Sequence, residues 1–88
     1  MYNYGYSDKL KDILAKLSKK NKSLYEQVLQ KINEIINSES IEHYKNLRHD
    51  LKEFKRVQVG HFVLVFKYDK NSNLISFEDF DHHIYIKK

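Results

Sequence analysis

The residues of this chain best suited to chemistry are two histidines, a tyrosine and an arginine in its second half. His82, His83 and Tyr85 lie in the closing segment FEDFDHHIYIKK, and Arg56 lies in the earlier segment KEFKRVQV. Imidazole transfers protons near neutral pH, and a guanidinium binds phosphate oxygens through a fixed fork of N–H donors. His83 and Tyr85 are two residues apart, so they share one face if this segment is a strand. The combination predicts proton transfer at a phosphodiester.

Metal-free cleavage of RNA is a reaction that needs only such groups. A base takes the ribose 2′-OH proton, cations stabilise the charge on phosphorus, and an acid protonates the leaving 5′-oxygen. We therefore expect Arg56, His82, His83 and Tyr85 to be catalytic. The alternative is that the histidines only solvate a last strand. Adjacent strand residues point to opposite faces and the chain has no cysteine, so we expect no metal site and no cofactor.

A run of cations precedes Arg56, in the stretch HYKNLRHDLKEFKR of residues 43–56. Its members expected to bind RNA are Lys45, Arg48, Lys52 and Lys55. Cations that project with the Phe54 ring from one strand face suit a phosphate backbone and a stacked base. The alternative is an ordinary solvated surface, because an aspartate and a glutamate dilute the run. Residues 41–47 are expected to form one further helical turn or an irregular connection.

Length and composition limit the class of protein. The chain has 88 residues, which predicts one domain spanning residues 1–88, and no cysteine to cross-link it. Its formal charge of +4 favours an anionic partner. No apolar run reaches the roughly 20 residues of a membrane span, and the N-terminus lacks a signal-peptide pattern, so we expect a cytoplasmic protein.

Two amphipathic helices are expected ahead of the cationic run. Ser7 or Asp8 is a suitable N-cap for a first helix that ends near Asn21. Ser23, followed three residues later by a glutamate, has capping-box spacing and predicts the start of a second helix that fades near Asn37. Each helix carries apolar residues at intervals of three or four, namely Leu10, Ile13, Leu14 and Leu17, then Leu24, Val28, Ile32, Ile35 and Ile36.

The rest of the chain predicts strands. Residues 2–6 alternate tyrosines with smaller residues, as a short strand does. From residue 52 to 59 the period is two, and Gly60 with the next residue fits a hairpin turn. Residues 62–68 then form a nearly continuous apolar strand, and residues 74–80 return after a polar turn. The fold class expected is α+β, with a short N-terminal strand and an antiparallel helical hairpin packed on an antiparallel β-meander.

Three segments resemble the RelE/ParE superfamily of toxins, of the RelE/StbE type found in toxin–antitoxin modules. LKDILAKLSKKNKSLYEQVLQKI is similar to the paired helices of that family. NLRHDLKEFKRVQVGHFVLVFKYD resembles its R-v-R-v-G-d-Y-R core, and FEDFDHHIYIKK its closing histidine and tyrosine. The resemblance implies the RelE-like fold and a ribosome-dependent endoribonuclease that cleaves mRNA in the ribosomal A site. It also implies a RelB-like antitoxin that holds the enzyme inactive.

The resemblance also implies roles for single residues. Arg56 matches the first basic position of the core strand, and Tyr85 matches the closing tyrosine, with His83 or His82 as the histidine before it. Two positions depart from the pattern, because Gln58 and Val63 stand where basic residues are usual. The alternatives are therefore a ParE-like inhibitor of DNA gyrase, or a catalytically degenerate protein that only binds an antitoxin.

Overall fold

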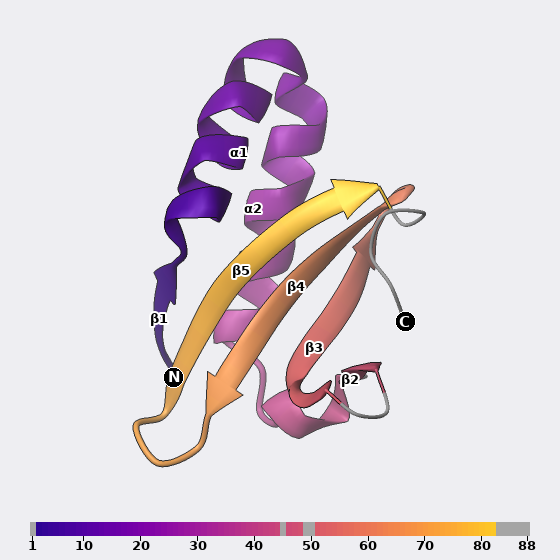
Figure 1. Cartoon of the computed structure of the whole chain (residues 1–88). Coiled ribbons are helices and arrows are strands. Elements are labelled where there is room, and N and C mark those ends of the chain that lie inside the picture. The colour runs from indigo at the N-terminus through magenta and orange to yellow at the C-terminus, as the bar shows by residue number, and fades with distance from the viewer. Residues whose placement is uncertain (1, 45, 49–50, 83–88) are drawn as a thin grey trace.

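Two helices lie against one face of a five-stranded sheet (Figure 1). The computed structural model describes residues 2–44, 46–48 and 51–82, and only the backbone of residues 46–48 and 51–53. The elements in chain order are β1 (Asn3–Tyr6), α1 (Asp8–Lys20), α2 (Lys22–Ile36), the 3₁₀ turn η1 (Ile41–His43), β2 (Asn46–Arg48), β3 (Leu51–Val59), β4 (Phe62–Asp69) and β5 (Leu74–His82). The expected α+β class with a helical hairpin on a meander is confirmed.

The strands are ordered β1-β5-β4-β3-β2 across the sheet. β3, β4 and β5 form the expected antiparallel meander, with the β3–β4 turn at Gly60, whose φ of 62° suits a residue without a Cβ. β1 pairs with β5 in parallel, and β2 pairs with the start of β3. The sequence predicted β1 as a strand without its direction, and it did not predict β2.

Short polar side chains fix both helix starts. Ser7 Oγ accepts a hydrogen bond from the Leu10 N–H at 3.0 Å and donates one to the Glu78 carbonyl at 2.7 Å, which ties the start of α1 to β5. Asn21 ends α1 and also caps α2, since its Oδ1 accepts from the Leu24 N–H at 3.2 Å. The prediction that Ser23 caps α2 is therefore wrong, because one asparagine serves both helices and leaves no linker.

The core lies between the helices and the inner face of the sheet. All five apolar residues predicted for the second helix are buried, as are Leu10 and Leu14 of α1. They pack with the inward side chains of the strands, namely Val59, Leu64, Phe66, Ile75, Phe77 and Phe80. Each such side chain contributes about 1.5–3 kcal/mol when removed from water. Neither α1 nor α2, the two α-helices in the described ranges, is long and apolar enough to cross a membrane.

η1 is held firmly between the N-terminal segment and the sheet. Ile41 is buried, and its N–H donates to the Tyr2 hydroxyl at 3.2 Å. The ring of Tyr44, the next residue after η1, meets the buried Phe66 ring edge-on at 5.6 Å between centroids. The helical turn expected over residues 41–47 is confirmed only for residues 41–43, because β2 begins at Asn46. The turn fixes the backbone from which His43 projects.

Candidate functional site

Arg56 projects from the sheet face opposite the helices. Its neighbours Val57 and Val59 pack against the core, so the alternation of a strand turns Arg56 outward. Across the sheet it pairs with Val65, which in turn pairs with Asp79. The Arg56 Nε is buried and has no hydrogen-bond partner among the described residues. Buried polar atoms in native proteins nearly always have partners, so the unpartnered Nε marks Arg56 as a candidate functional residue.

A pocket of about 300 Å³ opens beside Arg56, and we call it the Arg56 pocket. Its lining residues are His43, Tyr44, Arg56, Val57 and Gln58. The Nδ1 of His43 donates to the Ser40 carbonyl, and the His43 ring lies 4.1 Å from the Tyr44 ring between centroids. The Gln58 amide nitrogen donates to the Gly60 carbonyl at 2.9 Å. The pocket therefore combines one cation, one imidazole and an aromatic surface.

The two aromatic side chains of the pocket, those of His43 and Tyr44, differ in whether they can accept a proton. Burial raises the pKa of the Tyr44 phenol, the Glu34 carboxylate raises it further, and Lys31 partly offsets this. The phenol is thus protonated at neutral pH and does not act as a base there. Proton exchange near neutrality is a property of imidazole side chains. His43 is therefore the group of this pocket suited to accept a proton.

His82 lies on the other face of the sheet from Arg56. It pairs with Phe62, shares a face with Phe62 and Phe80, and stacks on His61 at 6.3 Å between ring centroids. The whole width of β4 also separates β5 from β3. The structure therefore does not bring His82 to Arg56, although both residues were predicted to be catalytic. His83 and Tyr85, the other two predicted catalytic residues, lie outside the described residues.

The four predicted RNA-binding cations have different places. Lys55 points to the helix-facing side of the sheet, where its Nζ donates to the Tyr44 carbonyl at 3.1 Å. Arg48 lies in β2 and Lys52 in β3, and only their backbone is described. Lys45 lies outside the described residues. Among the described side chains of these cations, only that of Arg56 lines the Arg56 pocket.

We predict that Lys55→Met lowers the free energy of unfolding by about 1–2 kcal/mol, because it removes a charged donor from the Tyr44 carbonyl. Urea unfolding followed by circular dichroism measures the change. The matched control is Lys70→Met, since Lys70 forms only an exposed pair with Glu42 at 3.7 Å. Equal stability of the two variants would show that the Lys55 contact does not support η1.

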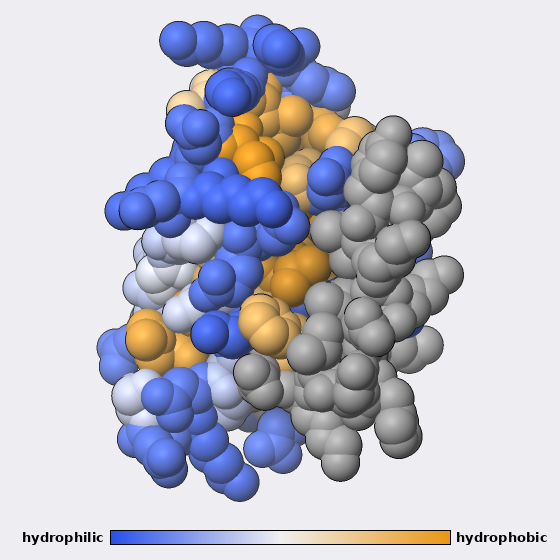
Figure 2. Space-filling model, viewed as in Figure 1, coloured by the Kyte–Doolittle hydropathy of each residue, from blue (hydrophilic) through white to orange (hydrophobic). Residues whose placement is uncertain are grey.

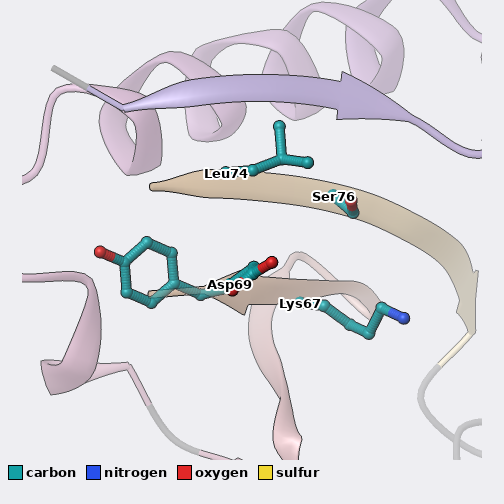
Figure 3. A pocket seen from close by; sticks show the side chains of 5 residues that line it. Lys67, Asp69, Leu74 and Ser76 are labelled. Atoms are coloured by element: carbon teal, nitrogen blue, oxygen red, sulfur yellow. The ribbon is translucent and has the colours of Figure 1, made fainter. Parts of the chain in front are cut away.

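A second pocket on the outer face has no comparable chemistry. It has a volume of about 390 Å³ and lies at the end of β4 and the start of β5. Figure 3 shows Lys67 directed away from Asp69, with Leu74 and Ser76 on the neighbouring strand. The Asp69 carboxylate accepts from the Asn71 N–H at 3.0 Å and so belongs to the turn. In the described part of the chain, no three His, Asp or Glu side chains gather to hold a metal ion.

An apolar groove lies where α1 passes the ends of β4 and β5, and we call it the α1–β5 groove. Its apolar residues are Ile13, Leu17, Phe62 and Phe80, and its charged ones are Lys9, Lys16, Lys20, Asp79 and Asp81. Its volume is about 430 Å³. Lys9 and Asp79 pair at 3.1 Å. Figure 2 shows an apolar surface in this region, flanked by hydrophilic side chains. The groove is suited to a partner with apolar residues, and its Lys16 and Lys20 side favours negative charge on that partner.

The sequence prediction did not include His43 among the functional residues. The relevant signal was the interval of three residues between Ser40 and His43, which is one helical turn and brings the imidazole to a backbone carbonyl. That interval is common in surface turns, so it carries weight only once Arg56 lies in the same pocket.

Comparison with known proteins gives the family. No family model matches the chain. A Methanocaldococcus jannaschii protein named "Putative toxin RelE4" is 47% identical over 91 residues, which covers 100% of this chain and 95% of the relative. An uncharacterized protein of Methanosarcina mazei is 42% identical over 84 residues, covering 94% of this chain and 95% of its own.

Solved structures give the same fold at low sequence identity. The isolated E. coli RelE toxin has a TM-score of 0.72 at 16% identity, covering 93% of this chain and 84% of its own. The E. coli RelBE toxin–antitoxin complex has a TM-score of 0.71 at 16% identity, covering 93% of this chain and 96% of its own. The RelBE2 complex of Mycobacterium tuberculosis has a TM-score of 0.61 at 20% identity, covering 92% of this chain and 96% of its own. A relative 47% identical over the whole chain, together with this fold, shows that the chain belongs to the RelE family of toxins.

Proposed function

We propose that this protein is a ribosome-dependent endoribonuclease that cleaves mRNA in the ribosomal A site, as the toxin of a toxin–antitoxin module in the cytoplasm. The observation that carries the proposal is the Arg56 guanidinium, whose buried Nε has no partner among the described residues and which lines a pocket open to a ligand. Membership of the RelE family supports the same activity. No cofactor is needed, because the reaction is a transfer of protons and a phosphoryl group.

The role proposed for Arg56 is stabilisation of charge. Attack on phosphorus adds negative charge to its nonbridging oxygens, and a guanidinium in a partly buried site stabilises that charge more strongly than one in water. Lys45, Arg48 and Lys52 are proposed as further contacts to RNA phosphates. His83 and Tyr85 are proposed to be catalytic, on the resemblance of the closing segment alone.

The two departures from the family pattern make Arg56 more important. Val63 is 5% exposed, so a basic side chain there would have to lose its hydration. Gln58 donates to the Gly60 carbonyl and so supports the β3–β4 turn. Neither position supplies charge to the site, which leaves Arg56 as the cation proposed to act on phosphorus.

Induced expression followed by primer extension on cellular mRNA tests the proposed function. We expect new 5′ ends in translated messages within minutes of induction, and none in messages without ribosomes. Growth arrest with intact mRNA would contradict the proposal. Altered supercoiling in that case would support the gyrase-directed alternative, and harmless expression would support an antitoxin-binding protein without activity.

The partner proposed for this toxin is a RelB-like antitoxin. Two of the structures with this fold are toxin–antitoxin complexes, which supports such a partner here. The α1–β5 groove suits an antitoxin segment that places apolar side chains on Phe62 and Phe80 and acidic ones beside Lys16 and Lys20. The net charge of +4 favours an acidic partner for the same reason.

We predict that reversing the charge of the groove, with Lys16→Glu and Lys20→Glu together, weakens binding of the antitoxin at least about tenfold, because like charges then face each other. Isothermal titration with the proposed RelB-like antitoxin measures the affinity. The matched control is Lys11→Glu with Lys19→Glu, which makes the same charge change on α1 outside the groove. Equal weakening by both pairs would show a general charge effect and no docking in the groove.

A further inference from the structure

The imidazole of His43 is held in one orientation and one tautomer. A carbonyl oxygen only accepts hydrogen bonds, so the contact between Nδ1 and the Ser40 carbonyl requires a proton on Nδ1. In the neutral ring, Nε2 then carries a lone pair. The ring rests on Tyr44, which packs on the buried Phe66, and the backbone of η1 is tied to Tyr2. His43 is therefore a positioned hydrogen-bond acceptor on a rigid support.

Among the described residues, the other groups that line the Arg56 pocket are not bases. The Arg56 guanidinium has N–H donors and no acceptor, Gln58 has an amide with no basic atom, and burial raises the pKa of the Tyr44 phenol. Among the described side chains, the pocket thus offers one basic atom, the His43 Nε2, and one cation, the Arg56 guanidinium.

A ribonucleotide carries two groups that complement this pair. Its 2′-hydroxyl is a donor, and the phosphate on the neighbouring 3′-carbon is an anion, so both lie within one nucleotide unit. A pocket of about 300 Å³ has room for that unit. Deoxyribose lacks the donor, so an acceptor at this point favours RNA over DNA.

We propose that His43 is the base that takes the proton from the ribose 2′-OH while Arg56 binds the adjacent phosphate; this rests on the proposed RNA cleavage. The proton moves to Nε2 as the 2′-oxygen forms a bond to phosphorus and the bond from phosphorus to the 5′-oxygen breaks. The 5′-oxygen takes a proton from water, and His43 returns its own proton to the hydroxide that remains. The products are a 2′,3′-cyclic phosphate and a 5′-hydroxyl.

The substitution that tests this is His43→Asn. The asparagine side-chain nitrogen lies near the position of Nδ1 and keeps a donor for the Ser40 carbonyl, whereas the acceptor at Nε2 is lost. We expect the single-turnover rate of cleavage on ribosomes programmed with a defined mRNA to fall about 10²–10⁴-fold, as for a lost general base. Affinity for the same complex with a 2′-deoxy nucleotide at the cleavage point is expected to be unchanged, since that ligand has no proton to give.

Two further variants keep the test sharp. His43→Ala is expected to regain part of its rate when free imidazole is added, which a purely structural role of His43 would not produce. Glu42→Gln, in the same turn and exposed, serves as the control and is expected to cleave within about twofold of the wild type. Thermal unfolding of each variant confirms that it is folded.

The results separate this inference from the proposed function. Cleavage by the wild type and an equal rate for His43→Asn would overturn the role of His43 and leave RNA cleavage standing. Loss of binding to the 2′-deoxy complex by His43→Asn would make His43 a binding group and would overturn its role as the base. A wild type that cleaves no RNA on ribosomes would overturn the proposed function and this inference together.

Discussion

Arg56→Ala is expected to lower the rate of mRNA cleavage by about 10²–10³-fold, the usual effect of removing one donor from a charge-stabilising site. Among the described side chains, Arg56 is the only cation that lines its pocket. Its Nε has no hydrogen-bond partner among the described residues, so the substitution leaves no partner of Nε unpaired. The loss therefore falls on the transition state and not on stability. Single-turnover cleavage on programmed ribosomes measures it, with thermal unfolding as the check on folding.

Arg56→Lys separates charge from geometry. A lysine keeps the positive charge but lacks the planar fork that pairs with two phosphate oxygens, so we expect a rate between those of the wild type and Arg56→Ala. Lys22→Gln, an exposed change at the start of α2, removes one charge far from the pocket and serves as the control. A wild-type rate for Arg56→Ala would remove the observation on which the proposed nuclease activity depends.

The elements of the fold were largely predictable because each rests on a local pattern. The apolar spacing of Val28, Ile32 and Ile35 predicts a helix face, and all three are buried. The period of two over residues 52–59 predicted that neighbouring side chains of β3 alternate between its faces, and the packing of Val57 and Val59 on the core places Arg56 outward. Gly60 marked the turn, since its φ of 62° is one that glycine adopts readily.

What was not predicted depends on contacts between distant parts of the chain. The direction of β1 depends on its register with β5, where Asn3 pairs with Leu74, and no local pattern encodes that pairing. β2 is three residues long and exists by pairing with β3. The N-cap of α2 at Asn21 was missed because the same residue is the C-cap of α1, and a capping pattern in the sequence describes one helix end at a time.

In the candidate site too, residues set by a local pattern were predicted and residues set by long-range contacts were not. Arg56 was found from its residue type and its neighbours on the strand. His82 was predicted to be catalytic, but its pairing with Phe62 turns it toward the helix side, away from Arg56. His43 was missed because it reaches the pocket through the turn after α2, and only the folded chain brings residues 43 and 56 together.

Phe66→Ala is expected to lower the free energy of unfolding by about 3–5 kcal/mol, since it leaves a cavity at a fully buried position of the central strand. A domain of this size has a total stability of about 4–13 kcal/mol, so the variant loses much of its fold. The Phe66 ring also supports the Tyr44 ring, on which His43 lies. The stability of the core and the geometry of the Arg56 pocket therefore depend on the same side chain.

Urea unfolding compares Phe66→Ala with Phe54→Ala, a matched truncation on the outer face, where the Phe54 ring lies under Lys67 at 5.4 Å. We expect the second variant to lose about 1 kcal/mol or less, because its ring is only partly buried. Phe66→Leu, which fills most of the cavity, is expected to lose less than Phe66→Ala and to keep more cleavage activity. If Phe66→Ala keeps full stability, the packing of Tyr44 and η1 on β4 is not what holds His43 in place. The proposed base would then need another support.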